Sequence, residues 1–367
     1  MDLPLKRDIY YSAFFNSTGF SQAAQDYIMS LFKGGYNIKI DPFVSIIKQG
    51  MSQDRFSFFQ KLEKNNISNN AIHIYHCIPN LQIRKSTHRY KKNVAITTYE
   101  TFDPPKIWID ILNKNDLVIV PSEFNRDTFL RSGLKSPIYH IPHCIDTDIY
   151  NDNRQLSAND NNFKFLFFGS WKERKGYAQL IEAWLKEFDR HDGVTLTIKT
   201  DKTAKASVYI NNILSDMKYK KKDIAPILLE SNIYDENGLP EFLKKFDCLV
   251  VPTMGEGFLL PGIQCMAVKV PVLITNCSGC QEYAKNNLAT LFEPTGYILK
   301  ESMDNYPQFS RKKWAYLTID EIRKKMRYVV ENKNVVDAKA EIAYKFVREN
   351  FSYKVILEKL NNILESV

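Results

Sequence analysis

The sequence predicts an α/β protein of two domains, each built on a mostly parallel sheet. Short apolar runs rich in β-branched residues alternate with helical segments along the chain, which is the pattern of βαβ units. The chain has 367 residues, more than a single hydrophobic core usually holds. A polar, asparagine-rich run at 151–162 divides the predicted strands into two sets of about six and is typical of a linker.

The first strand is predicted at residues 9–15, and a polar loop that contains Gly19 follows it. Ser21 is expected to cap a helix that ends near residue 33, because its hydroxyl can accept a hydrogen bond from an amide of the first turn. A strand, a glycine turn and a helix in this order can bind an anion through backbone amides. The alternative is a plain turn between a strand and a helix.

The remaining strands of the first domain are predicted at residues 38–42, 71–77, 94–98, 116–122 and 138–141. Helices are expected near 56–65 and from residue 123. His73 and His76 are expected near the crevice side of their strand, although a lone strand histidine is more often structural. Tyr99 and Glu100 directly follow the strand at 94–98.

The second domain is predicted to begin with a strand at 163–168, which leads into a glycine-bounded loop at 169–176. A helix from Tyr177 carries apolar residues at helical spacing. Further strands are predicted at 194–199 and 227–229, with a lysine-rich helix between them. The expected buried stripe of that helix is Tyr209, Ile213 and Met217.

The most informative stretch is a predicted strand, loop, helix and strand at residues 248–275. The first strand ends at a proline, Gly257 allows the backbone to turn sharply, and Pro261 is expected at the first position of the helix. The amides of residues 258–260 would open this helix, and such a helix mouth favours an anion such as pyrophosphate. An ordinary βαβ crossover with a tight turn is the alternative.

Two polar residues of this stretch are candidates for ligand binding. Glu256 is expected at the carboxyl end of the strand, which is the usual ligand crevice of an open α/β sheet. Gln264 is expected about one turn inside the helix, on the face that can look back toward the same crevice.

Composition and charge narrow the class of protein. Hydrophobic residues make up 44% of the chain and charged residues 25%, which is ordinary for a soluble globular protein. The formal net charge of +8 comes mainly from lysines. A charge run is usually a solvated face, but it also suits an anionic acceptor or peripheral contact with an anionic membrane. Nucleic acid is an unlikely partner, because no recognised nucleic-acid module accompanies the charge.

The sequence favours a cytoplasmic setting. The six cysteines are scattered, and several fall in predicted buried strands or helices, so a disulfide framework is not expected. No signal peptide opens the chain, and no apolar run reaches the length of a transmembrane helix. Any membrane contact is therefore expected to be peripheral.

The stretch from Glu256 to Val272 resembles the signature of retaining glycosyltransferases of family 4 in the GT-B superfamily. Gln264 stands where the signature has the second glutamate of a pair. The matching residues are Glu256-Gly257-Phe258, Leu260-Pro261, Met266-Ala267 and Pro271-Val272, and the departures are Leu259, Gln264, Cys265 and Lys269.

The loop at 169–176 resembles another element of the same family, in which an arginine and a lysine hold the donor pyrophosphate. Lys175 matches the lysine, and Ser170 stands at the arginine position. Arg174 is a candidate substitute, because a planar guanidinium beside a lysine suits phosphate oxygens. The alternative is ordinary surface charge.

The resemblance implies a GT-B fold, in which two Rossmann-like domains face an interdomain cleft. The acceptor-side domain is expected at 1–150, the linker at 151–162 and the domain that binds the nucleotide sugar at 163–350. A closing helix at 351–367 is expected to cross back and pack on the first domain.

The implied activity is transfer of a hexose-type sugar from a nucleotide-diphosphate sugar to a glycan, lipid or protein acceptor, with retention of anomeric configuration. No metal or other cofactor is expected, because Lys175, Arg174 and the helix mouth can neutralise the leaving diphosphate. Two alternatives remain open. One is a non-catalytic protein that binds a nucleotide sugar or a glycan, and the other is a nucleotide-sugar epimerase or a phosphorylase.

The resemblance also assigns roles to single residues. The expected catalytic residues are Glu256, Lys175, Arg174 and Glu100. The expected donor-binding residues are Gly19, Tyr99, Gly169, Ser170, Gly257, Phe258, Leu259, Leu260 and Gln264.

Overall fold

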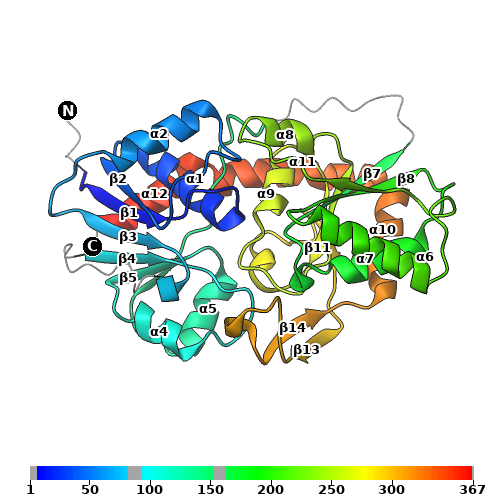
Figure 1. Cartoon of the computed structure of the whole chain (residues 1–367). Helices are drawn as coiled ribbons and strands as arrows, with labels where there is room; N and C mark the ends of the chain where they lie inside the picture. The colour runs from blue at the N-terminus through cyan, green and yellow to red at the C-terminus, as the bar shows by residue number, and fades with distance from the viewer. Residues whose placement is uncertain (1–5, 82–91, 152–161, 366–367) are drawn as a thin grey trace. The chain divides into compact units, whose positions relative to one another are not determined.

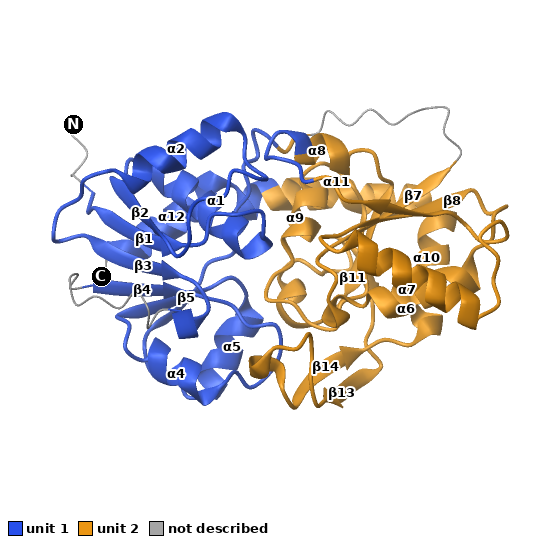
Figure 2. Cartoon of the chain, in the orientation of Figure 1, with its two compact units in different colours: residues 1–149, 233–238, 348–367 blue, residues 150–232, 239–347 orange. Residues whose placement is uncertain are grey.

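The computed structural model describes residues 6–81, 92–151 and 162–365 (Figure 1). The chain forms two compact units (Figure 2). Unit 1 comprises Met1–Ile149, Ile233–Gly238 and Arg348–Val367, and unit 2 comprises Tyr150–Asn232 and Leu239–Val347. The predicted linker at 151–162 lies almost entirely outside the described residues.

Unit 1 is built on a parallel sheet with the strand order β2-β1-β3-β4-β5-β6. The order reverses direction at β1, where Ile9 is paired with Ile38 on one side and with Ile72 on the other. This is a Rossmann-like arrangement. The strands are β1 (Ile9–Ala13), β2 (Ile38–Pro42), β3 (Ile72–His76), β4 (Lys92–Ile96), β5 (Leu117–Val120) and β6 (Ile138–His140).

Helices cover both faces of this sheet. Apolar side chains of α1, α2 and α12 share one core with β1 to β4, and α4 and α5 lie on the other side of the strands (Figure 1). The helices are α1 (Gly19–Lys33), α2 (Gln53–Glu63), α4 (Lys106–Leu112), α5 (Glu123–Arg131) and α12 (Tyr353–Leu364).

The helix α12 ends the described chain and belongs to unit 1. Ile356 and Leu360 are fully buried on its inner face, and Ser30 Oγ of α1 donates a hydrogen bond to the Tyr353 carbonyl over 2.8 Å. The Tyr353 hydroxyl also donates to Asp26 Oδ1 over 2.6 Å. The last helix is therefore held to α1 by apolar burial and by buried polar contacts.

The start of α1 corrects one prediction. The capping residue is Thr18, whose side chain accepts a hydrogen bond from the Ser21 amide, so Ser21 lies inside the helix. The Ser21 hydroxyl instead donates to the Phe14 carbonyl over 2.7 Å and accepts from the Asn16 amide over 2.8 Å. Ser21 thus ties the loop to the helix from within the first turn.

Unit 2 repeats the architecture, with the strand order β12-β11-β10-β7-β8-β9 and parallel pairing throughout. The strands β10 and β11 are buried at every residue, as expected for central strands of a covered parallel sheet. The strands are β7 (Phe163–Phe168), β8 (Val194–Lys199), β9 (Ile227–Glu230), β10 (Cys248–Val251), β11 (Val272–Thr275) and β12 (Thr290–Phe292).

The helices of unit 2 match the predictions unevenly. The helix from Tyr177 is confirmed, but the predicted stripe of α7 is wrong, because Ala206, Ile210 and Leu214 are its buried residues. The α-helices are α6 (Tyr177–Glu187), α7 (Thr203–Asp216), α8 (Gly238–Leu243), α9 (Leu260–Met266), α10 (Ile319–Glu331) and α11 (Lys333–Phe351). The short 3-10 helices are η1 (Glu173–Lys175), η2 (Ser278–Glu282) and η3 (Pro307–Phe309).

A separate antiparallel hairpin follows β12 in unit 2. It consists of β13 (Gly296–Lys300) and β14 (Lys312–Tyr316), joined by the loop at 301–311. The sequence predicted neither of these strands. Among the residues that the structure describes, no helix combines the length and apolar character needed to cross a bilayer.

Candidate active site

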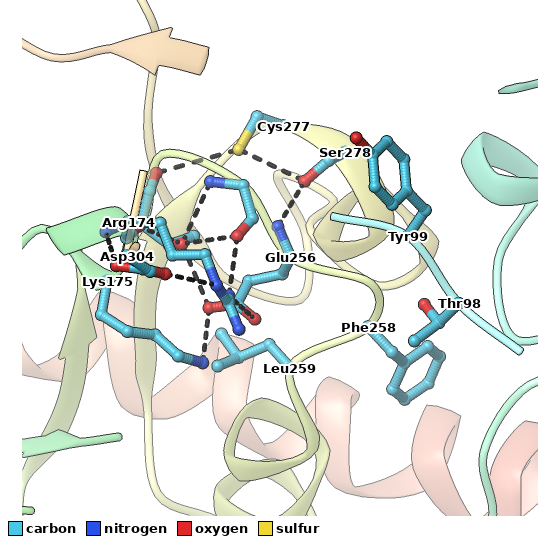
Figure 3. A network of polar contacts seen from close by, with 12 residues as sticks. Thr98, Tyr99, Arg174, Lys175, Glu256, Phe258, Leu259, Cys277, Ser278 and Asp304 are labelled. Carbon is cyan, nitrogen blue, oxygen red and sulfur yellow. Dashed lines mark hydrogen bonds and ion pairs between the residues drawn. The ribbon is translucent and has the colours of Figure 1, made fainter. Parts of the chain in front are cut away.

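A buried ionic cluster lies beyond the carboxyl ends of β7 and β10 in unit 2 (Figure 3). Glu256 Oε2 lies 2.9 Å from Arg174 Nη1, and Glu256 Oε1 lies 2.6 Å from Lys175 Nζ. The exposed fraction is 8% for each of the two cations and 4% for Glu256. The predicted catalytic residues of this unit therefore meet in one place.

The short helix η1 brings the two cations to this place. Gly176, which ends η1, has a φ of 74°, and a Cβ on it would lie 1.9 Å from the Pro252 carbonyl oxygen. Glycine is required here both for its left-handed backbone and for the close approach to the end of β10. The Met254 amide then donates to the Arg174 carbonyl over 2.7 Å, which fastens the two loops together.

Backbone contacts fix the loop that carries Glu256. The Glu256 amide donates to Ser278 Oγ over 2.8 Å, and the Gly279 amide donates to the Glu256 carbonyl over 2.9 Å. A Cβ on Gly279 would lie 1.9 Å from the Gly257 carbonyl oxygen, so only glycine allows this approach. Thr253 Oγ1, 3.1 Å from Glu256 Oε1, adds a further polar contact to the carboxylate.

The charges of the cluster stabilise one another. Burial opposes ionisation of Glu256, but the adjacent Lys175 and Arg174 outweigh it and lower the pKa of the Glu256 carboxyl. Burial also lowers the pKa of Lys175, although Glu256 partly counteracts that effect. Glu256 is therefore a carboxylate at neutral pH and not a proton donor.

Asp304 is a member of the cluster that the sequence did not predict. Its Oδ2 lies 3.2 Å from Arg174 Nε, and its side chain is 1% exposed. Burial raises the pKa of Asp304, while the nearby Arg174 favours its ionised form. Asp304 belongs to the loop at 301–311, whose sequence shows no periodicity or motif that could have linked it to Arg174.

The loop before α9 is more buried than the sequence indicated. Phe258, Leu259 and Leu260 are all buried, and the Tyr283 hydroxyl lies within hydrogen-bond distance of the Phe258 and Leu259 carbonyls at 2.9 and 2.6 Å. Leu259 has a φ of 67° and is the capping residue, so Pro261 stands at the second position of α9 and not the first. Gly257, which precedes this segment, forms the turn beside Gly279.

Gln264, Gly169 and Ser170 are the remaining predicted donor-binding residues of unit 2. Gln264 is buried in the second turn of α9, with an exposed fraction of 3%. Gly169 directly follows β7, and a Cβ on it would stand 3.5 Å from Lys175 Cδ, an ordinary contact. Ser170 follows it with a partly exposed side chain, so position 170 is not part of the buried cluster.

The other predicted site residues belong to unit 1 and are not members of the ionic cluster. Gly19 is the exposed first residue of α1. Tyr99 is fully buried within unit 1, where its ring packs edge-on against Trp108 at 5.5 Å between centroids. Glu100 follows it as a half-buried residue.

The two strand histidines of unit 1 make buried polar contacts. His73 Nε2 lies 2.8 Å from Ser12 Oγ, and His76 Nδ1 lies 2.8 Å from the Tyr11 hydroxyl. Burial lowers the pKa of His76 well below its usual range. These contacts favour the structural role that the sequence analysis left open.

All six cysteines are buried thiols. In the described part of the chain, no three His, Cys, Asp or Glu side chains gather in a way that could hold a metal ion.

Residues 162–304 match the family described as Glycosyl transferases group 1. An uncharacterised protein of the Sulfolobus islandicus rod-shaped virus 1 is 24% identical over 303 residues, which cover 76% of this chain and 78% of the viral protein. An uncharacterised glycosyltransferase of Methanocaldococcus jannaschii is 32% identical over 136 residues, which cover 36% of this chain and 35% of that protein.

Two solved structures are similar to this chain over nearly its whole length. HepE of Anabaena, in complex with UDP and glucose, has a TM-score of 0.72 at 12% identity and covers 99% of this chain and 100% of its own. Sucrose-phosphate synthase of Thermosynechococcus elongatus has a TM-score of 0.69 at 13% identity, with coverage of 98% and 99%. The chain therefore has the GT-B fold. Together with the family match at 162–304, this fold supports the interpretation of the chain as a GT-B glycosyltransferase.

Proposed function

We propose that this protein is a retaining glycosyltransferase of the family 4 type. It transfers a hexose-type sugar from a nucleotide-diphosphate sugar to a glycan, lipid or protein acceptor, without a metal ion. The observation that carries the proposal is the buried group of Arg174, Lys175 and Glu256 beyond the carboxyl ends of β7 and β10. Open α/β sheets bind ligands at these ends, and two adjacent cations suit a diphosphate.

The two cations act on the leaving diphosphate. Negative charge grows on the bridging oxygen as the bond to the sugar breaks, and fixed positive charges lower the energy of that state. Glu256 holds both cations in place before the donor arrives, so little reorganisation is needed during the reaction. A divalent cation would supply the same charge in enzymes that lack such residues.

Glu256 itself is proposed to contact the donor sugar. Its two carboxylate oxygens already face Lys175 and Arg174, and its pKa is lowered, which makes it a poor general acid and a weakened nucleophile. The proposed reaction is therefore a front-face attack, in which the leaving phosphate helps to deprotonate the acceptor. Catalysis then rests on positioning and on charge stabilisation.

The remaining donor contacts are assigned to both units. Gln264 is proposed to bind the ribose. Gly169, Ser170 and the segment 257–260 are proposed to contact the rest of the donor. Gly19, Tyr99 and Glu100 are proposed to serve the sugar or the acceptor from unit 1. The net charge of +8 supports an anionic acceptor or peripheral contact with a membrane surface, and the scattered cysteines support a cytoplasmic enzyme.

The proposal is tested first by donor binding. The purified chain is heated with uridine, guanosine and adenosine diphosphate sugars in turn, and UDP-glucose comes first because HepE was solved with UDP-glucose. A true donor raises the melting temperature further as its concentration exceeds its dissociation constant. If none of the nucleotide sugars stabilises the chain, the proposal is wrong.

Turnover and stereochemistry follow with the donor that binds. Incubation with simple glycan and lipid acceptors should release the nucleoside diphosphate, and proton NMR of the product should show the anomeric configuration of the donor. An inverted product would contradict the retaining assignment. Donor binding with no turnover on any acceptor would favour the non-catalytic binding protein.

A further inference from the structure

The β13–β14 hairpin of unit 2 contacts three successive residues of the turn that carries the proposed phosphate-binding cations. Lys172 Nζ hydrogen-bonds to the Tyr306 hydroxyl and stands 4.1 Å from the centroid of its ring. Glu173 Oε1 lies 2.9 Å from Lys300 Nζ. The third contact joins the loop to Arg174, and it is the most buried of the three.

Asp304 makes this third contact at two points. Its Oδ2 lies 3.2 Å from Arg174 Nε, and its Oδ1 accepts a hydrogen bond from the Arg174 amide over 3.4 Å. Figure 3 shows the Asp304 carboxylate beside Arg174, with Glu256 near the far end of the guanidinium. Asp304 therefore meets both the backbone and the side chain of the same arginine.

The guanidinium of Arg174 is held along two edges. Asp304 Oδ2 forms an ion pair with Nε that does not have hydrogen-bond geometry, while Nη1 donates to Glu256 Oε2 over 2.9 Å and to the Gly255 carbonyl over 3.0 Å. A planar group that is hydrogen-bonded at Nη1 and paired with a carboxylate beside Nε has a more restricted orientation than one held at Nη1 alone. Orientation matters because phosphate oxygens are recognised by the direction of the guanidinium N–H bonds.

The loop is shaped to present Asp304. Both Asp304 and Asn305 have left-handed backbones, with φ of 55° and 58°. Asp and Asn adopt this conformation more readily than other residues that carry a side chain, so the chain can turn sharply here. The anchors are buried: Met303 is fully buried, and Phe309 packs against Trp314 at 5.1 Å between ring centroids.

We propose that Asp304 is a positioning residue that orients Arg174 toward the donor diphosphate, so that the hairpin loop shapes the phosphate site. This inference rests on the proposed function. The rival role is competition, in which the Asp304 carboxylate occupies Arg174 at the expense of the diphosphate. The two roles predict opposite effects on phosphate affinity when the charge of Asp304 is removed.

The test variant is Asp304→Asn in the full chain. Asparagine has the same shape and tolerates the left-handed backbone of this position, so the loop should keep its conformation. Asp304→Gly is a second variant, which also suits this backbone and is used if the first does not fold. The control is Glu301→Gln, which removes the same charge from the same loop at a side chain that is 78% exposed.

The probe is inorganic pyrophosphate, the group that all nucleotide-diphosphate sugars share, and binding is measured by calorimetric titration. We expect Asp304→Asn to weaken binding roughly tenfold and Glu301→Gln to stay within about twofold of the wild type. Because Asp304 acts through Arg174, adding Asp304→Asn to Arg174→Ala should weaken binding no further. If Asp304 had only a structural role, Asp304→Asn would weaken pyrophosphate binding equally in the wild type and in the Arg174→Ala variant.

Each outcome decides between the possibilities. If the wild type does not bind pyrophosphate, the proposed phosphate site fails, and with it the role of Asp304. If the wild type binds and a folded Asp304 variant binds equally well, the positioning role alone is wrong. Tighter binding by the variant would establish competition instead, and an additive loss in the double variant would reduce Asp304 to a structural residue.

Discussion

At the scale of single residues, Arg174 and Lys175 have the same charge but different surroundings. In the described part of the chain, Lys175 pairs with the Glu256 carboxylate, whereas Arg174 lies between Glu256 and Asp304. We expect Arg174→Ala and Lys175→Ala each to reduce transition-state stabilisation by roughly 2–4 kcal/mol, measured as kcat/KM with the cognate donor. Wild-type turnover by both folded variants would remove these residues from the site.

Gln264 tests the resemblance at the position where the family has a carboxylate. A neutral amide offers one acceptor and one donor, so it can still engage both ribose hydroxyls, but with weaker bonds. Gln264→Ala should therefore weaken binding of the cognate nucleotide by about 1–2 kcal/mol, and Gln264→Glu should bind as well as the wild type or better. Calorimetric titration measures both. If the alanine variant binds like the wild type, Gln264 faces only the core.

Glu256 should make stability depend on acid pH. Its pKa is lowered in the folded protein, so its stabilising effect is complete above its unfolded pKa, about 4.3, and is lost as the pH falls through the folded value. Glu256→Gln should lower the free energy of unfolding at pH 7 by roughly 3–5 kcal/mol, because it removes the carboxylate that the two buried cations share. Urea unfolding between pH 3 and pH 7 should show this difference shrinking in acid. The exposed Glu301→Gln is the control and should change the free energy of unfolding little at any of these pH values. If the loss of stability in Glu256→Gln were the same at all pH values, Glu256 would not be the buried carboxylate with a lowered pKa that we infer.

At the scale of elements, two loops of unit 2 are joined where glycine alone fits. A Cβ on Gly279 would lie 1.9 Å from the Gly257 carbonyl oxygen, and backbone atoms cannot yield as a flexible side chain can. We expect Gly279→Ala to destabilise the protein by more than about 2 kcal/mol in urea unfolding. Gly238→Ala is the control, because its Cβ would stand 3.4 Å from the end of the Asp235 side chain. If the two variants were equally stable, the η2 segment would have to shift at little energetic cost to accommodate the added Cβ.

At the scale of the whole molecule, the chain returns to its first unit after completing the second. Residues 348–367 belong to unit 1 with residues 1–149, and Leu360 of α12 is fully buried there. Leu360→Ala should cost roughly 2–4 kcal/mol of unfolding free energy, whereas the exposed Glu358→Ala should cost less than about 0.5.

The same variant separates stability from ligand binding. The ionic cluster consists of unit 2 residues, so Leu360→Ala should leave pyrophosphate affinity within about twofold of the wild type, by the additivity of independent sites. Calorimetric titration at a temperature where the variant remains folded measures this. A larger loss of affinity would show that the core of unit 1 supports the phosphate site.

The sequence by itself determined the α/β class, the strands of both sheets except β12, and the identity of the main cluster residues. Strands such as 163–168 and 194–199 were predicted to the residue, because buried parallel strands are short apolar runs that differ sharply from their neighbours. Glu256, Lys175 and Arg174 were expected because the loops that follow two of these strands resemble motifs of the glycosyltransferase family. These signals are local, so they survive in a single sequence.

Only the tertiary structure decided what depends on contacts between distant segments. Asp304 reaches Arg174 across 130 positions of sequence, and no local pattern marks it. The cap at Thr18 in place of Ser21, and the buried stripe of α7 shifted by one position, depend on which side chains the surrounding core accepts. The hairpin β13–β14 likewise has an irregular loop whose shape comes from buried anchors. Packing and charge pairing set these features, and both act between residues that the order of the chain keeps apart.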